Sequence, residues 1–358
     1  MEVKSSELTK SRKKIELDKK LDSDMMLRGP LNPDTKVDTM TVGALELYSE
    51  HCVRNDAALA SRLRQIVIEK RFSKLPGWAA GGEQKYETDI IRHAYRRHDR
   101  TVKFIVPWVN QYFPLKDKRV VEVGCGTGSS TAAFAKFVDH VGAYEISPDS
   151  VEGAKLRLEA HGLAHKTDIN LVKADEIWAR IAADSKYKPP DILLLFAVLE
   201  HQTLDERLET LAEAQRVVKP GGIIIICETP NRLVYFDNHT SRLPFFQMLP
   251  IELQAKVAAH SPRSDFRESM LRALENGGGR DGIHMYLMRW GQSVSFHEFD
   301  LAFENIDSRI LSGGDHPNIM KLRPPEIHEE LLRQYMESAG IKRHPAFSRY
   351  FIDMIIRV

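Results

Sequence analysis

The chain has 358 residues, enough for about two domains or for one large domain with additions. Hydrophobic residues make up 42% and charged residues 28%, which is typical of a soluble globular protein. The formal net charge of +1 provides no overall basic field for nucleic acid. The longest apolar run, residues 192–199, is far shorter than the roughly 20 residues that span a bilayer, so we expect no membrane association.

The amino-terminal segment, residues 1–38, is rich in Lys, Ser and Asp and shows no hydrophobic periodicity. We therefore expect a mobile tail. The amino-terminal residues also contain no apolar core of a secretory signal. The three cysteines, Cys52, Cys125 and Cys227, form neither a CxxC pair nor a metal-ligand spacing. We therefore expect reduced thiols and a cytoplasmic location.

Residues 39–113 have apolar positions at spacings of three and four, which predicts a helical region. Pro107 predicts a break in its last helix, because proline removes a backbone donor and clashes with the preceding turn. The basic segment RHAYRRHDR, residues 92–100, is typical of a solvated helix face.

Beyond residue 113, short apolar strands alternate with helical segments. Strands without polar alternation indicate a parallel sheet that is covered on both faces, and this chain order is that of a doubly wound α/β fold. The predicted strands are 119–124, 140–147, 169–175, 191–198 and 222–229, and the predicted helices are 129–138, 148–161, 176–184 and 204–218.

Residues 231–295 interrupt this alternation and are rich in Pro, aromatic residues, His and Arg. At the end of this insertion, Ser295 and Glu298 are spaced as a capping box that begins another helix. The chain then closes with a predicted helix at 325–340 and a predicted strand at 349–358.

A glycine turn, VVEVGCGTG, joins the first predicted strand to its helix and carries Gly124, Gly126 and Gly128. No Lys follows these glycines, so the turn is not a phosphate loop, and the third glycine of a dinucleotide fingerprint would fall at Ser129. Glu122, just before the turn, would repel a pyrophosphate but would pair with an ammonium group. A ligand that has an ammonium and an adenosine but no phosphate is S-adenosylmethionine.

Two further acids follow strands. Glu145 ends the second predicted strand, where a carboxylate can accept both ribose hydroxyls, although NAD enzymes use the same device. Asp175 ends the third and could accept from the adenine amino group, with Ile177 or Trp178 packing on the ring. Simple helix capping is the alternative for Asp175, and capping of neighbouring amides is the alternative for Glu122.

With these features in order, the sequence resembles the class I S-adenosylmethionine-dependent methyltransferases over about residues 100–230 and again over the closing helix and strand. The matching motifs are VVEVGCGTG, YEIS, KADEI, PDILLLFAVLEH and RVVKPGGIIIICETPNRL. The resemblance implies a Rossmann-like sheet of seven strands whose last strand, 349–358, is antiparallel. It implies a cofactor-binding domain made of 114–230 and 296–358, and a lid at 231–295.

The resemblance also implies which residues bind the cofactor, S-adenosylmethionine. They are Glu122, Gly124, Cys125, Gly126, Thr127, Gly128, Glu145, Ile146, Ala174, Asp175, Glu176 and Phe196.

The fourth predicted strand ends in FAVLEHQ, at the edge of the sheet where the reaction is expected. Methyltransferases that act on exocyclic amines or on glutamine carry (D/N)PP(Y/F) here, and this chain does not. Glu200 and His201 stand there instead, as in quinone-type and glycan-type members. A hydroxyl acceptor needs a base, for which His201 is the first candidate and His239 the second, with Glu200 as a further catalytic residue. A histidine that only shapes the pocket is the alternative for His201.

The insertion resembles family members that methylate saccharides or other polar metabolites. The candidate acceptor-binding residues in it are Arg232, Tyr235, Asp237, Asn238 and Arg242. We therefore expect transfer to oxygen of a small polar molecule, without a metal, because histidine does not suit magnesium. Residues 39–113 would cover the acceptor and are a candidate dimer surface.

Three alternatives remain open at this point. Transfer to sulfur or nitrogen of an amino-acid-like metabolite would use Arg232 and Arg242 to bind a carboxylate. RNA methylation would use the basic helix at 92–100, which could instead contact an anionic acceptor, but the near-neutral net charge counts against nucleic acid. A binding module that holds the cofactor without transfer is the third.

Overall fold

The structure is a computed structural model that describes residues 48–358 except 76, 186–187 and 276–278. The predicted tail, 1–38, lies outside the described residues. Leu47–Val358 form one compact unit. Within the described part of the chain, every helix is too short or too polar to cross a membrane.

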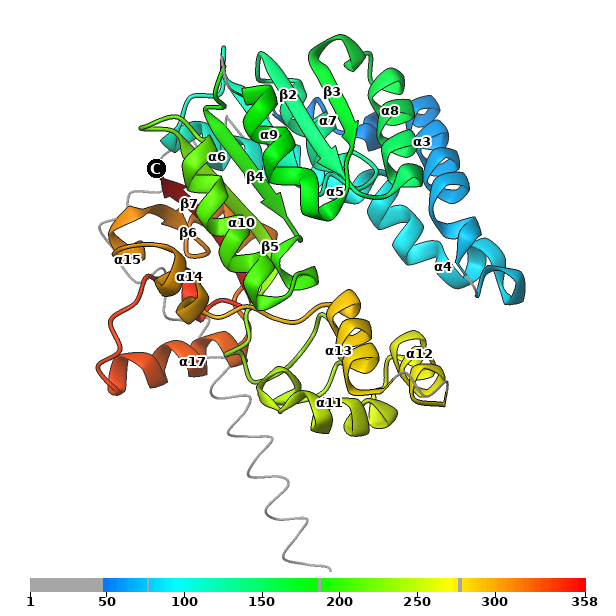
Figure 1. Ribbon diagram of the computed structural model, residues 1–358. Coiled ribbons are helices and arrows are strands. Elements are labelled where there is room, and N and C mark those ends of the chain that lie inside the picture. Colours follow the sequence, from blue (N-terminus) through cyan, green and yellow to red (C-terminus); the bar gives the residue numbers. More distant parts are fainter. Residues whose placement is uncertain (1–47, 76, 186–187, 276–278) are drawn as a thin grey trace, which may run out of the picture. The chain divides into compact units, whose positions relative to one another are not determined.

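A sheet of seven strands lies at the centre of this unit, in the order β3-β2-β1-β4-β5-β7-β6 (Figure 1). Strands β1 to β5 pair in parallel, whereas β7 is antiparallel to both β5 and β6. The predicted doubly wound, seven-stranded fold is confirmed. The strands are β1 (Arg119–Val123), β2 (His140–Glu145), β3 (Thr167–Leu171), β4 (Ile192–Phe196), β5 (Ile223–Pro230), β6 (Ile310–Gly313) and β7 (Phe351–Arg357).

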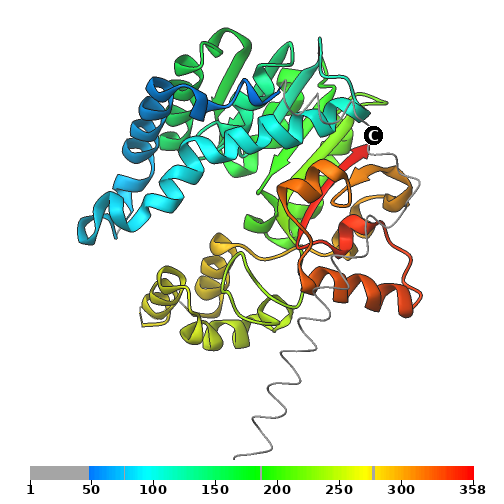
Figure 2. The same ribbon diagram turned by 180° about the vertical axis from the view of Figure 1, so that it is seen from behind.

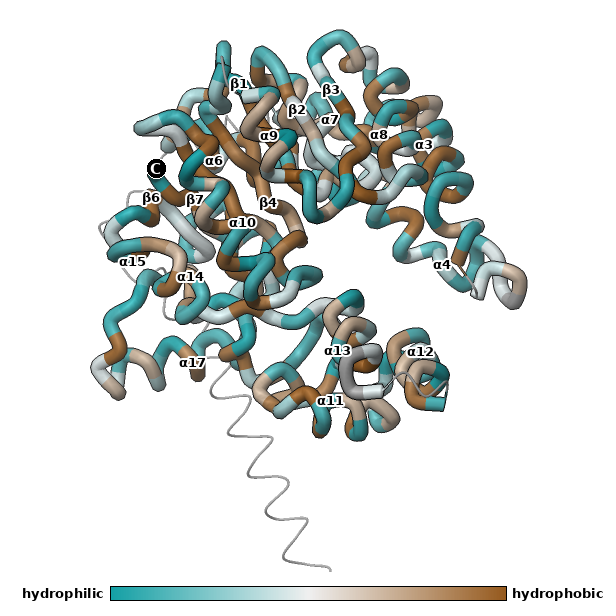
Figure 3. The backbone as a smooth tube through the Cα atoms, in the orientation of Figure 1, coloured by the Kyte–Doolittle hydropathy of each residue, from teal (hydrophilic) through white to brown (hydrophobic). Residues whose placement is uncertain are grey.

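Helices cover both faces of the sheet, and the alternating residues of β5 show why. Ile224 and Ile226 are buried in a core cluster with α10, whereas Ile223 and Ile225 are buried in a second cluster with α6. Figure 3 shows the hydrophobic central strands between more polar helices. The helices that pack on the sheet are α6 (Val106–Tyr112), α7 (Ser129–Ala135), α8 (Pro148–Ala160), α9 (Ile177–Ser185), α10 (Leu204–Val217), α14 (Phe296–Ala302) and α16 (Pro317–Leu322).

The described part of the amino-terminal region is helical, as predicted. It contains α3 (Ala57–Lys70) and a continuous helical run that crosses the back of the sheet (Figure 2). The prediction of a break at Pro107 is wrong, because Pro107 lies in the first turn of α6 directly after a π-turn. The run consists of α4 (Gly82–Ile91), the π-turn η4 (Arg92–Arg96), α5 (Arg97–Arg100), the π-turn η5 (Thr101–Ile105) and α6.

The insertion after β5 has a hydrophobic cluster of its own, in which Phe246, Phe266 and Leu287 are fully buried. Its helices are α11 (Ile251–Val257), α12 (Ser264–Glu275) and α13 (Gly279–Trp290). The predicted capping box of Ser295 and Glu298 is present at the start of α14. The remaining helices are α15 (Ile306–Arg309) and α17 (Ile327–Ser338).

One strand prediction is wrong, and one strand was not predicted from the sequence. The third strand is β3, which ends at Leu171, so the KADE sequence forms a loop and the short turn η7 (Ala174–Glu176) instead of strand. The sixth strand, β6, has four residues, ILSG, and was not located from the sequence. A segment this short carries too little alternation to mark a strand, and only pairing with β7 defines it.

Candidate cofactor and acceptor site

The glycine turn lies at the carboxyl end of β1, where the strand order reverses between β1 and β4. Gly124, Gly126 and Gly128 have φ values of +71°, +52° and +75°, which side chains rarely adopt. A Cβ on Gly126 would meet no atom within 4 Å, so this backbone faces open space. A Cβ on Gly124 would lie 2.9 Å from Val198 Cγ2, so the turn closely approaches the exit of β4.

Glu145, at the end of β2, holds its carboxylate against this turn. It accepts a 2.8 Å hydrogen bond from the amide of Gly126, and it accepts others from the amides of Ile146 and Ser147 at 2.8 and 3.0 Å. The next side chain, Ile146, is 58% exposed although it is large and apolar. A carboxylate for hydroxyls beside an uncovered apolar side chain fits the nucleoside part of S-adenosylmethionine.

Glu122 is fully buried, and burial raises its pKa. One carboxylate oxygen accepts from the hydroxyl of Ser130 and the other from that of Thr131, so Glu122 ties β1 to the start of α7. Its pairing with the ammonium of the cofactor stays a prediction, and it requires these hydroxyls to share the carboxylate.

The other predicted cofactor residues surround the turn in two groups. Cys125, Thr127 and Phe196 are buried, and burial raises the pKa of the Cys125 thiol, so this cysteine is a thiol and not a thiolate. Residues 174–176, which include Asp175, are exposed on η7 beyond β3. Their position leaves the Asp175 carboxylate accessible to a ligand.

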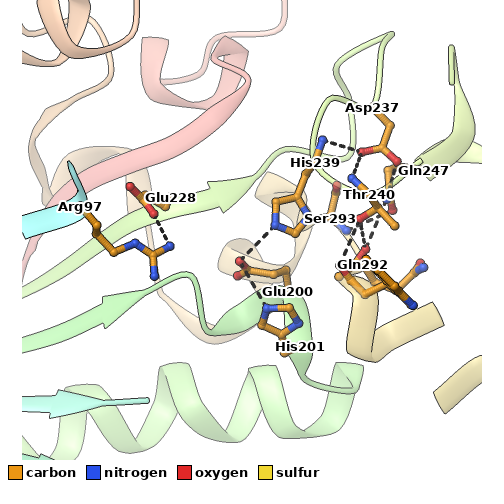
Figure 4. Close-up of polar contacts among 12 residues, drawn as sticks. Arg97, Glu200, His201, Glu228, Asp237, His239, Thr240, Gln247, Gln292 and Ser293 are labelled. Atoms are coloured by element: carbon orange, nitrogen blue, oxygen red, sulfur yellow. Dashed lines mark hydrogen bonds and ion pairs between the residues drawn. The ribbon is translucent and has the colours of Figure 1, made fainter. Parts of the chain in front are cut away.

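The three predicted catalytic residues lie together (Figure 4). Glu200 and His201 belong to the short helix η8 (Leu199–His201) after β4, and His239 comes from the insertion. Nε2 of His201 is 3.9 Å and Nε2 of His239 is 4.0 Å from Oε1 of Glu200. The two ring centroids are 6.3 Å apart.

Burial sets the charge of this group. Glu200 is fully buried, neither carboxylate oxygen has a hydrogen-bond partner among the described residues, and burial raises its pKa to about 8. Burial lowers the pKa of His239 to about 4, and the neighbouring His201 adds to this shift. The pKa of His201 is also lowered by burial, although carbonyls at the end of α13 partly oppose the shift. At neutral pH, two neutral imidazoles therefore flank a mostly protonated carboxyl group.

Comparison with known proteins decides the family. The sequence profile described as a methyltransferase domain matches residues 91–307, which is more than half of the chain. The chain belongs to the class I S-adenosylmethionine-dependent methyltransferases. Its cofactor is S-adenosylmethionine.

The individual relatives of this chain are distant. A ubiquinone biosynthesis O-methyltransferase from Aromatoleum aromaticum is 30% identical over 35% of this chain and 49% of its own. A carboxy-S-adenosyl-L-methionine synthase from Vibrio atlanticus is 22% identical over 56% of this chain and 74% of its own. The solved structure of CalS10, an amino pentose methyltransferase from Micromonospora echinaspora, matches with a TM-score of 0.31 and 21% identity. The match covers 40% of this chain and 55% of the CalS10 chain. The chain spans about half the length of the first of these relatives.

Asp237, predicted to bind the acceptor, holds the insertion loop together. It is buried, and its carboxylate accepts hydrogen bonds from the amides of His239, Thr240 and Ser241 at 2.8–3.1 Å. It also accepts a 3.2 Å bond from the amide side chain of Gln247 (Figure 4). These contacts fix the backbone that carries His239.

The other predicted acceptor residues contact groups other than the histidine pair. Arg232 donates from Nε to the carbonyl of Ser293, and Asn238 donates to Glu326, just before α17. Tyr235 packs against the ring of Phe245, and Arg242 is exposed. Their roles in acceptor binding stay predictions.

A second polar group beside the site was missed from the sequence. Glu228 of β5 is bound by Arg97 at 2.6 Å and by Arg323 at 3.1 Å. Burial alone would raise the pKa of Glu228, but the two guanidinium groups lower it to about 2. Arg97 belongs to the basic segment that was predicted to be a solvated face, so one of its arginines instead faces the sheet.

A β-bulge directs Glu228 to these arginines. The pairing of β5 with β7 shifts between Ile226 and Thr229, and Glu228 has a φ of +60°. Its backbone amide donates to Asp353 of β7, which also binds Arg323. No alternation pattern predicts a left-handed residue inside an apolar strand.

Arg207 of α10 was also missed, and it holds the segment that carries Glu200. It is buried, pairs with Glu298 at 2.9 Å, and donates to the carbonyls of Leu199 and Gln292 at 2.7 and 2.6 Å. The amide of Gln292 donates in turn to the carbonyl of Glu200 at 2.8 Å. The sequence signal was weak, because nothing in the sequence distinguishes Arg207 from an ordinary helix arginine.

Among the described residues, no group of three or more His, Cys, Asp or Glu could hold a metal ion.

Proposed function

We propose that the chain transfers a methyl group from S-adenosylmethionine to a hydroxyl oxygen of a small polar metabolite or saccharide. The observation that carries this proposal is the pair of neutral histidines over Glu200, which lies just after the exit of β4 that the glycine turn approaches at Val198. An oxygen acceptor loses its proton as it attacks, so it needs a neutral base in reach.

The cofactor, when bound, supplies a methyl group on sulfonium that is already activated for transfer. The chain's own residues align the acceptor, exclude water and remove its proton. His201 is the first candidate for the base, because its side chain is 44% exposed and reachable by an acceptor. Once protonated, its imidazolium lies 3.9 Å from Oε1 of Glu200 and favours loss of the Glu200 proton to solvent. The resulting carboxylate stabilises the new charge.

His239 is the second candidate. Its side chain is 24% exposed, and its Nδ1 is 3.1 Å from the hydroxyl of Thr240, which fixes the ring orientation. A Cβ on Gly291 would lie 2.7 Å from Cε1 of His239, so the ring packs directly on the backbone. This tight seat suits a histidine that orients the acceptor or relays a proton from His201.

Oxygen is favoured over sulfur or nitrogen for two reasons. A thioether or an unprotonated amine can attack without losing a proton, and the histidine pair would then have no role in proton removal. Several distant relatives, including that from Aromatoleum aromaticum, are named as O-methyltransferases. Transfer to sulfur or nitrogen stays the alternative.

The test is a cofactor-consumption assay over a panel of sugars, phenols and amino-acid-like metabolites. The methyl group carries an isotopic label, so that the acceptor atom is read from the product. His201→Ala should lose transfer, whereas the control His165→Ala, an exposed histidine far from β4 in sequence, should retain it. A labelled product methylated at nitrogen or sulfur, or full turnover by His201→Ala and His239→Ala, would overturn the proposal.

A further inference from the structure

Arg157 of α8 is a fully buried arginine whose side chain donates hydrogen bonds to three backbone carbonyls. Its Nε donates to the carbonyl of Thr127 in the glycine turn at 2.6 Å. Its Nη1 and Nη2 donate to the carbonyls of Ala94 and His93 at 2.7 Å each. Burial lowers its pKa to about 10, so it is still a cation at neutral pH. One side chain therefore joins the cofactor turn to the amino-terminal helical run.

Two of the three carbonyls that Arg157 binds, those of His93 and Ala94, belong to the π-turn η4. A π-turn widens the helix, is rare, and occurs frequently at functional sites. The hydroxyl of Ser129, the first residue of α7, also donates to the carbonyl of His93, at 3.2 Å. The widened turn is thus held from the glycine-turn side by two separate residues.

The residue directly after η4 reaches the opposite side of the site. Arg97 donates to Glu228 at the carboxyl end of β5 at 2.6 Å (Figure 4). The contacts therefore run from Thr127 through Arg157 and η4 to Arg97 and Glu228. One series of hydrogen bonds therefore joins the glycine turn to the helix that carries Arg97.

We propose that Arg157 is a positioning residue that couples cofactor occupancy of the glycine turn to the placement of η4 and Arg97. This inference rests on the proposed function only in that the turn binds S-adenosylmethionine. A ligand seated on the turn fixes the Thr127 peptide, and Arg157 then fixes η4 and the acceptor side of the site. By linkage, order in η4 raises cofactor affinity by the same factor.

The coupling is measured without an acceptor. S-adenosylhomocysteine, the demethylated cofactor product, is titrated calorimetrically into the full chain, and amide hydrogen exchange is followed with and without it. In the wild type, the ligand should slow exchange both in the glycine turn and in residues 92–105. In Arg157→Met, slowing should be confined to the glycine turn, and affinity should fall about tenfold, within the usual range of coupling between sites.

Two further variants and one control complete the test. Arg157→Lys keeps the charge but can reach fewer carbonyls, so it should restore part of the response. Ser129→Ala removes one hydrogen bond to the carbonyl of His93. It replaces Arg157→Met in the test if that variant does not fold, and it should weaken the slowing of exchange in residues 92–105. Lys155→Met, an exposed charge on the same helix, should behave as the wild type.

The two proposals fail in different ways. Absence of heat with the wild-type chain would overturn cofactor binding and, with it, the coupling. If the wild-type chain gives heat and the ligand slows exchange in the glycine turn but leaves exchange in residues 92–105 unchanged, the coupling alone would be overturned. A full response in Arg157→Met would also overturn it.

Discussion

Oε1 of Glu200 lies 4.0 Å from Nε2 of His239, which joins the end of β4 to a loop of the insertion. The carboxyl is fully buried and the imidazole is partly buried, so each holds its neutral form at neutral pH. This relationship defines the reacting centre that we propose, and most of the following predictions probe it.

Replacement of either histidine should separate catalysis from cofactor binding. For His201→Ala, we expect kcat to fall by about 10²–10⁴-fold, the usual contribution of a general base, with the Kd for S-adenosylmethionine nearly unchanged. Activity of the wild type should also fall as pH decreases below 6.5, through the lowered pKa of His201. Steady-state kinetics measures kcat, and calorimetry measures the Kd for S-adenosylmethionine. An equal loss of kcat and of cofactor affinity in His201→Ala would count against a role as base.

Glu200 should make the fold less stable as pH rises. Its folded pKa of about 8 lies above the ordinary value of 4.5, so the folded state binds more protons than the unfolded state between these pH values. The free energy of unfolding should therefore fall by up to about 1.4 kcal/mol per pH unit relative to Glu200→Gln. Urea denaturation at pH 5, 6.5 and 8 measures the difference, and the exposed control Glu159→Gln should show no such trend.

The interaction of Arg97 with Glu228 should appear as coupling in a double-mutant cycle. Arg97→Met leaves the Glu228 carboxylate with Arg323 alone, and we expect a loss of about 1.5–3 kcal/mol of stability, typical of a hydrogen bond to a charged group. In Glu228→Gln the same arginine substitution should cost less, because the charge is already gone. Strict additivity of the two substitutions would contradict the observed pair.

Gly291 should not tolerate even a methyl group. Its φ is +114°, and an added Cβ would approach Cε1 of His239 to 2.7 Å. Gly291→Ala should therefore cost about 1–3 kcal/mol of stability and displace the His239 ring, with loss of turnover. The matched control is Gly282→Ala in α13, where a Cβ would meet nothing within 4 Å and alanine favours the helix. Similar stabilities for the two variants would refute this account.

Glu145 should contribute strongly to cofactor affinity. Its carboxylate lies against the amide of Gly126 at the end of β2, where ribose hydroxyls are expected. Glu145→Gln should weaken binding of S-adenosylmethionine by about tenfold or more, because a hydrogen bond to a charged acceptor is worth roughly 1.5–3 kcal/mol. Calorimetric titration measures it, and the exposed Glu159→Gln again serves as the control.

The sequence predicted the sheet well because its signals are local. An apolar run such as that of β4, ILLLF, avoids water only if both of its faces are buried. Strands that are buried on both faces are typical of a parallel sheet with helical crossovers. Gly124, Gly126 and Gly128 have positive φ values, and the sequence indicates this backbone conformation because glycine adopts it far more readily than other residues. Where local signals are short or misleading, as at β6 and Pro107, prediction failed.

The sequence alone determined the fold class, the glycine turn with its flanking acids, and the candidates Glu200, His201 and His239. Only the tertiary structure decided that these three meet, that Asp237 holds a loop, and that Arg97, Arg157 and Arg207 reach backbone or charge partners across the fold. The physical reason is range. Hydrophobic periodicity and backbone conformation are properties of neighbouring residues, whereas the burial and partners of a polar side chain depend on which distant segments pack around it.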